Sequence, residues 1–344
     1  MSIGYRVRRL RSIGLEAVSF ARGYRELRRT NATPVDAYRS MRNLYCLTNG
    51  RSNDGVSWLL SRAHPPTRLP GADSVLGDVS DESVRRIVQD IDQNGFHVFE
   101  RKLPAETVDR LRKFAERVPC RATVVADQVG VGKDLNAPAP YRGHPVESPR
   151  YDFDQQAILG DATVQGLLMD SGLRRVAQAF LRCDPILDLL AMWWSRPFHG
   201  KASTEAAQLY HFDMDRIKFL KFFFYLTDVT PESGPHCYVR GSSKRKPRPI
   251  LRDGRISDDE IRSHYPKSDL VEICGPTGSI IAVDTRGWHK GKALTERERL
   301  LLQFEFTNSM FGQSYPRTDL PKDTSASFRE FVQKNPRMFQ GIVE

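Results

Sequence analysis

The sequence lacks several features that would point away from an ordinary globular protein. No apolar run reaches ~18 residues, so no membrane-spanning helix is predicted. The basic N-terminus has no continuous apolar segment followed by a cleavage site, which argues against a secretory signal. The cysteines form no Cys-x-x-Cys pair and are odd in number, so we expect free thiols in a reducing compartment such as the cytoplasm. They are Cys46, Cys120, Cys183, Cys237 and Cys274.

What is present favours one large domain with an appended basic segment. The chain has 344 residues, of which 40% are hydrophobic and 27% charged, and its net charge is +10. Arginines make up most of the charged residues among the first 30, where apolar residues recur at helical spacing. We therefore predict a basic helical extension over residues 1–75 and a second domain over residues 76–344.

Two interpretations of the basic helix remain open. It can lie peripherally on an anionic membrane surface, or it can dock on the rest of the chain with a solvated basic face. Nucleic acid is not an expected partner, because the chain carries no recognised nucleic-acid-binding motif.

The triplet His211-Phe212-Asp213 is the most informative local pattern. On a strand, residues i and i+2 point to the same face, so His211 and Asp213 can offer an imidazole and a carboxylate side by side. His289, from a facing strand, would add a third ligand. Two histidines and one carboxylate with open positions opposite are typical of non-haem Fe(II) oxygenases. Because such a triplet is common on protein surfaces, the sequence around it decides whether it indicates a metal site.

Apolar, aromatic and β-branched runs surround the triplet and predict strands. They lie at residues 187–194, 218–226, 278–284 and 300–306. Helical periodicity predicts helices at residues 34–47, 81–94, 105–117 and 164–181. Residues 52–55 are predicted to form a loop before a short helix at residues 56–62.

The order of these runs resembles one known family. Tyr225-Leu226-Thr227-Asp228-Val229, a Gly-containing loop at residues 231–235 and the turn Arg240-Gly241-Ser242-Ser243 resemble the phytanoyl-CoA dioxygenase family of Fe(II)/2-oxoglutarate oxygenases. The resemblance covers about residues 80–310. It implies a mainly β fold with flanking α-helices, built on a double-stranded β-helix (jelly-roll, cupin-like) core.

The resemblance also implies roles for particular residues. His211, Asp213 and His289 would be the metal ligands and catalytic centre, holding Fe(II) with positions left for 2-oxoglutarate and O2. Arg299 would bind the far carboxylate of 2-oxoglutarate, with Arg297 as the fallback on the same strand face.

Two further positions bear on 2-oxoglutarate binding. Gln208 resembles a glutamine that contacts 2-oxoglutarate in some relatives. Several relatives carry a hydroxyl where this chain has Gly291, and Tyr225 or Thr227 could replace it.

The predicted activity is hydroxylation of an unactivated C–H bond. Relatives that halogenate generally lack the carboxylate that Asp213 supplies here. Desaturation and cyclisation stay open, as does the oligomeric state. The basic balance favours a small anionic metabolite, acyl, sugar or lipid-linked substrate, which the sequence does not identify. Two alternatives are a cupin-like metal barrel without 2-oxoglutarate chemistry and a non-catalytic ligand-binding barrel. Arg299 argues against the first and the complete ligand set against the second.

Overall fold

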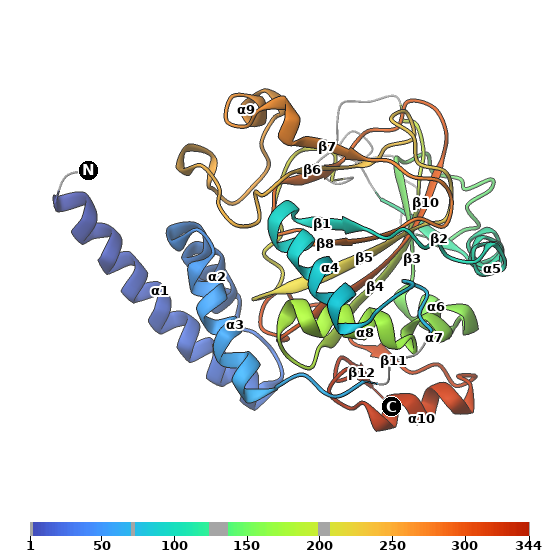
Figure 1. The fold of residues 1–344 in the computed structure, drawn as a ribbon, viewed down its shortest axis with the longest axis horizontal. Helices are drawn as coiled ribbons and strands as arrows, with labels where there is room; N and C mark the ends of the chain where they lie inside the picture. The colour runs from blue at the N-terminus through green and yellow to red at the C-terminus, as the bar shows by residue number, and fades with distance from the viewer. Residues whose placement is uncertain (1–2, 70–72, 124–136, 199–206, 344) are drawn as a thin grey trace.

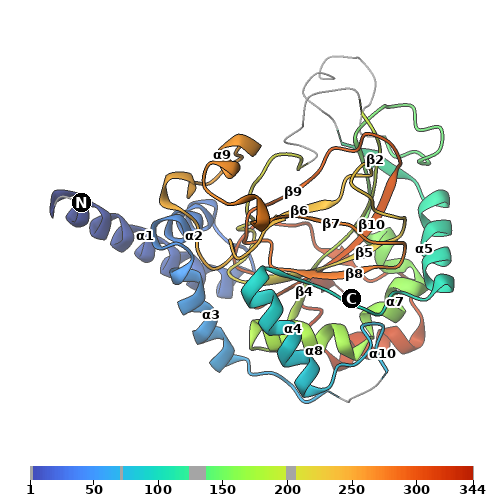
Figure 2. The ribbon, with the colours of Figure 1, turned by 45° about the horizontal axis from the view of Figure 1, so that its top comes forward.

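The core of the protein is a pair of antiparallel sheets (Figures 1 and 2). The computed structural model describes all residues except 1–2, 70–72, 124–136, 199–206 and 344. A seven-stranded sheet has the order β1-β8-β5-β10-β4-β3-β2, and a three-stranded sheet has the order β7-β6-β9. The first comprises β1 (Phe96–Val98), β2 (Cys120–Ala122), β3 (Arg150–Phe153), β4 (Ile186–Ser195), β5 (Phe219–Tyr225), β8 (Ile280–Val283) and β10 (Arg299–Thr307). The second comprises β6 (His236–Val239), β7 (Leu270–Ile273) and β9 (His289–Gly291). This arrangement is the predicted jelly-roll.

The long central strands are buried on both faces, which explains their near-continuous apolar composition. Successive side chains point to opposite faces of a strand. In β5, Phe222 and Phe224 therefore join the cluster beneath the helices, whereas Phe223 and Tyr225 point between the two sheets. The space between the sheets is the place where a buried site can form.

Helices cover the outer face of the large sheet (Figure 1). They are α4 (Asp81–Asn94), α5 (Ala105–Arg117), α6 (Gln155–Gly160), α7 (Ala162–Leu168), α8 (Ser171–Leu181) and α10 (Ala326–Lys334). The bounds of α4 and α5 agree with the prediction. The helix predicted over residues 164–181 is instead divided. Asp170 accepts hydrogen bonds from the backbone N–H groups of Gly172 and Leu173, and so caps the start of a new helix.

Three helices precede the barrel and lie along one side of it (Figures 1 and 2). They are α1 (Ile3–Thr30), α2 (Val35–Thr48) and α3 (Arg51–Ala63). The prediction of a loop at residues 52–55 is wrong, because these residues form the first turns of α3. Thr48 Oγ1 accepts a hydrogen bond from Ser52 N at 3.1 Å, and buried Asn53 donates to the carbonyl of Ile217. The polar residues thus start a helix and face the barrel.

The remaining elements are short. The segment between β6 and β7 contains η2 (Arg248–Ile250), α9 (Asp258–Arg262) and η3 (Lys267–Asp269). Near the C-terminus, β11 (Thr318–Asp319) pairs with β12 (Ile342–Val343). Across the described ranges, no helix has both the length and the apolar character needed to cross a membrane.

Candidate metal centre

His211, Asp213 and His289 come together between the sheets. Their candidate ligand atoms all lie within 4.8 Å of one another. His211 and His289 form an antiparallel bridge, in which His211 N donates to His289 O at 3.0 Å and His289 N donates to His211 O at 2.8 Å. The two imidazole rings consequently lie side by side, with centroids 4.3 Å apart.

The segment that carries His211 and Asp213 is less regular than a strand. Only the bridge at residues 210–211 is sheet-like, and Asp213 N donates instead to Thr285 O at 2.9 Å. Both backbone contacts are to the segment that leads into His289. The predicted i, i+2 relationship therefore holds because one neighbouring segment supports both residues.

The two histidines present the same ring nitrogen to the centre. His211 Nδ1 lies 2.9 Å from Leu209 O, and His289 Nδ1 lies 3.0 Å from Gly287 O. A carbonyl only accepts hydrogen bonds, so each Nδ1 carries the proton and each Nε2 keeps a free lone pair. These Nε2 atoms are 3.5 and 3.6 Å from the two oxygens of Asp213. Burial lowers the pKa of both histidines, which favours the neutral form that binds metals.

Asp213 is held by a buried lysine that sequence reasoning missed. Lys221 Nζ lies 2.7 Å from Asp213 Oδ2, 3.3 Å from Glu305 Oε2 and 3.9 Å from Asp215 Oδ2. Burial opposes ionisation of Asp213, but the charges of Lys221 and the two histidines hold the pKa of that carboxyl well below its usual range. Burial raises the pKa of Glu305. The positive charge of Lys221 thus keeps Asp213, rather than Glu305, ionised. The available signal was a lysine inside an otherwise apolar strand.

Arg299 begins β10 and is buried between the sheets, with 6% of its surface exposed. One terminal nitrogen donates to Ser195 Oγ at 3.3 Å, while Nε is buried and has no hydrogen-bond partner. Burial lowers the pKa of this guanidinium. A buried arginine with an unused donor fits an anionic group such as a carboxylate.

Arg297 differs from its predicted position. It lies in an exposed bend before β10 and does not share the strand face of Arg299. Arg299, and not Arg297, is therefore the buried cation at this end of β10.

His236 is a second unexpected residue. It opens β6, is buried, and its ring lies 5.2 Å from that of His289 and 5.1 Å from that of Phe223. Burial and the nearby charge of Arg299 lower the pKa of His236 to about 3, and its Nε2 has no hydrogen-bond partner. His236 thus stacks on His289 and lies near enough to Arg299 for the charge of that guanidinium to lower its pKa.

The other predicted positions have mixed outcomes. Gln208 is half-buried, three residues before His211. Gly291 pairs with His236 in the small sheet. The Tyr225 hydroxyl already donates to Ile273 O at 2.7 Å, whereas Thr227 Oγ1 accepts from Leu300 N and keeps its own proton to donate. Thr227 is therefore better placed than Tyr225 to supply an extra donor.

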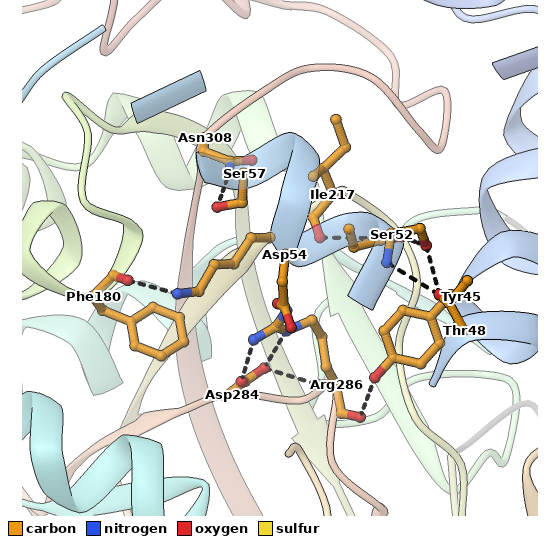
Figure 3. Close-up of polar contacts among 12 residues, drawn as sticks. Tyr45, Thr48, Ser52, Asp54, Ser57, Phe180, Ile217, Asp284, Arg286 and Asn308 are labelled. Carbon is orange, nitrogen blue, oxygen red and sulfur yellow. Dashed lines mark hydrogen bonds and ion pairs between the residues drawn. The ribbon is translucent and has the colours of Figure 1, made fainter. Parts of the chain in front are cut away.

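The turn that leads into His289 is fastened to the N-terminal helices (Figure 3). The Arg286 guanidinium makes two bonds to the Asp284 carboxylate, at 2.9 and 2.8 Å, and a third to Asp54 of α3 at 3.1 Å. Tyr45 of α2 donates to Arg286 O at 3.3 Å. Residue Thr285, whose carbonyl holds Asp213, lies inside this turn. Helices α2 and α3 therefore support the backbone that positions two of the three candidate ligands.

Fold and candidate ligands together define a jelly-roll with a two-histidine, one-carboxylate centre. The profile of the phytanoyl-CoA dioxygenase (PhyH) family matches residues 91–300, and the chain belongs to this family. No curated protein sequence matches the chain significantly. The family's cofactors are Fe(II), 2-oxoglutarate and O2. The donor set fits Fe(II), and the unpartnered buried nitrogens of Arg299 and His236 fit an anionic cosubstrate beside it.

The chain is also similar to several solved structures, each at low sequence identity. EctD from S. alaskensis, solved with 2-oxoglutarate and 5-hydroxyectoine, is 19% identical, with a TM-score of 0.47 over 71% of this chain and 82% of that one. HygX from Streptomyces hygroscopicus, solved with nickel, 2-oxoglutarate and hygromycin B, is 18% identical, with a TM-score of 0.44 over 71% and 94%. EvdO2 from Micromonospora carbonacea var. aurantiaca, solved with 2-oxoglutarate, is 20% identical, with a TM-score of 0.45 over 68% and 92%.

Proposed function

We propose that this chain is a 2-oxoglutarate-dependent hydroxylase that acts on an unactivated C–H bond of a small anionic metabolite, acyl, sugar or lipid-linked substrate. The observation that carries the proposal is the convergence of His211, Asp213 and His289 within 4.8 Å, with both Nε2 lone pairs directed at the centre. When bound, Fe(II) with 2-oxoglutarate supplies the activation of O2, and 2-oxoglutarate leaves as succinate and carbon dioxide.

The chain's own residues divide the work. The imidazoles of His211 and His289 and the carboxylate of Asp213 bind the metal, and the carbonyls of Leu209 and Gly287 orient the two rings. These carbonyls hold each proton on Nδ1. The apolar surroundings of the centre limit the access of water.

Arg299 is proposed to bind the far carboxylate of 2-oxoglutarate. Its unused Nε and its place at the start of β10 support this role over Arg297. His236 is proposed to line the path between the metal and Arg299, and Gln208 to contact 2-oxoglutarate near His211. The presence of Asp213 favours hydroxylation over halogenation. Because Arg299 provides the anion site, the proposal is preferred to a cupin-like barrel without 2-oxoglutarate.

Succinate formation tests the proposal. The full chain with Fe(II) and 2-oxoglutarate should release succinate slowly even without its substrate. Asp213→Ala should abolish both succinate release and iron binding while the circular dichroism spectrum is unchanged. Metabolite profiling of a deletion strain, compared with the parent, should then show a compound that differs by one oxygen. Retained turnover in Asp213→Ala would remove the ligand assignment, and a product altered without gain of oxygen would replace hydroxylation with desaturation or cyclisation.

A further inference from the structure

A second hollow lies away from the metal centre, between α1, α3 and the C-terminal segment. Its volume is about 1170 Å³, which exceeds the roughly 300–1,000 Å³ of typical small-molecule sites. Among the described residues, its lining includes none of His211, Asp213 and His289. The hollow, called here the α1 cavity, is thus distinct from the proposed reaction site.

The α1 cavity is long and has an aromatic wall. It is lined along α1 from Phe20 to Arg28, a stretch of about 12 Å at ~1.5 Å per residue. Phe20 and Tyr24 pack their rings on Phe311 at 4.7 and 5.7 Å, which anchors α1 over the cavity. Apolar side chains continue the lining on the other elements, namely Leu59, Leu60, Leu189, Leu190 and Met310. An extended apolar body matches this shape.

The charged part of the lining is almost entirely cationic. Asp188 is the one acidic residue among the described lining residues, and it is already neutralised by Arg216, with two contacts of 2.6 Å. The other charged lining residues are four arginines, namely Arg25, Arg28, Arg317 and Arg337.

These four arginines lack carboxylate partners. Within the described part of the chain, the side chains of Arg25, Arg28 and Arg317 make no hydrogen bond or ion pair, and the Arg337 side chain donates to the carbonyls of Asp184 and Asn308. Burial and then the charges of Arg337 and Arg28 lower the pKa of His64, which keeps this lining imidazole neutral beside the arginines. Positive charges gathered around a concave surface raise the local concentration of anions.

We propose that the α1 cavity binds an elongated amphiphile with an anionic head group, either a carboxylate or a phosphate. The apolar body would lie along Phe20 and Tyr24, and the head group would pair with Arg28 and Arg317. Arginine suits both head groups because its planar fork donates two parallel hydrogen bonds. The site does not depend on the reaction proposed for the metal centre.

Calorimetric titration of the full chain tests the proposal, with ligands kept below their micelle concentrations. Dodecanoate and dodecyl phosphate should bind at least about tenfold more tightly than uncharged dodecanol, since a hydrogen bond to a charged group is worth roughly 1.5–3 kcal/mol. The tighter of the two anions identifies the head group. Equal binding of dodecanol, or no binding of either anion, would overturn the proposal.

Matched variants locate the site. The double variant Arg28→Gln/Arg317→Gln should lose about tenfold or more in affinity. Arg22→Gln should change nothing, because Arg22 is exposed on the same helix but does not line the cavity. An equal loss of affinity in both variants would mean that only the net charge of the protein attracts the ligand. Asp213→Asn should bind dodecanoate as the parent does, and loss of binding there would place the ligand at the metal centre instead. Thermal melting of each variant verifies that it is folded.

Discussion

Lys221 Nζ lies 2.7 Å from Asp213 Oδ2, and the same ammonium group reaches Glu305 on the neighbouring strand at 3.3 Å. The proposed metal ligand is thus tied through one cation to the middle of the large sheet. Because Glu305 is fully buried, Lys221 also compensates a carboxyl that has no other ion-pair partner at this distance among the described residues.

Removing this lysine should weaken metal binding. In Lys221→Met, Asp213 loses both its orienting contact and the charge that keeps it ionised, so protons compete better for the carboxylate. Loss of an outer contact of this kind typically costs about 10–100-fold in metal affinity. Titration with Co(II), followed by its visible absorption, measures the change. Lys292→Met, which removes a partly exposed pair with Glu272, serves as the control. Unchanged Co(II) affinity in Lys221→Met would show that Asp213 is positioned by its backbone alone.

Arg299→Ala should raise the KM for 2-oxoglutarate. The loss of a charge-assisted contact of about 2 kcal/mol corresponds to roughly 30-fold. Arg297→Ala should leave the KM within about twofold, because Arg297 is exposed in the bend before β10. Steady-state succinate release at varied 2-oxoglutarate gives both values. The opposite pattern would move the cosubstrate toward the exposed bend.

The buried Lys246 should make stability rise with pH. Burial lowers the pKa of Lys246 to about 7, although its Nζ donates to Tyr45 Oη and Ser242 O at 3.0 Å each. Between pH 7 and about 10 the unfolded chain therefore still binds a proton that the folded chain has released. The unfolded state then holds more protons, and the free energy of unfolding grows by up to about 1.4 kcal/mol per pH unit in that window.

Urea denaturation at pH 7 and pH 9 measures this effect against Lys246→Met. The increase should be smaller in the variant, because it lacks the titrating group, while all other groups titrate alike. The same increase in both proteins would mean that the ammonium stays charged through its hydrogen bonds.

The membrane contact of α1 stays a prediction. The helix packs on α2 and on Phe311, yet Leu10, Leu15 and Val18 are 69%, 66% and 61% exposed. With arginines on the same helix, they should give binding to anionic vesicles that weakens as salt rises, since charges are screened within about 10 Å at 0.1 M. Vesicle co-sedimentation of the full chain and of Leu15→Ser/Val18→Ser measures it. If the parent chain stays in solution at low salt, α1 is a docked helix and nothing more.

Sequence patterns predicted the parts of the fold that depend on local periodicity and caps. The strands around His211 and His289 are apolar runs, and α4 ends where Gly95 adopts a φ of 93°. The start of α3 was missed because its polar residues satisfy partners far along the chain, as Asn53 does with Ile217.

The candidate site, too, was predictable from the sequence only in part. The three candidate metal ligands follow from a short pattern, and Arg299 follows from the family resemblance. Lys221, Glu305 and His236 acquire their surroundings only when β5, β6 and β10 meet, and no spacing along the chain encodes that meeting. The α1 cavity likewise joins residues about 290 positions apart, such as Phe20 and Met310.

The stretch matched by the family profile is not the same as the unit that must fold. The match ends at residue 300, the second residue of β10, although β10 lies between β5 and β4 in the large sheet. A fragment limited to residues 91–300 would leave two strands with open edges that invite aggregation. It would also leave Arg286 without Asp54 and Tyr45. The family profile thus marks the stretch that holds most of the candidate chemistry, whereas the large sheet and the contacts that support the His289 turn extend beyond the matched residues.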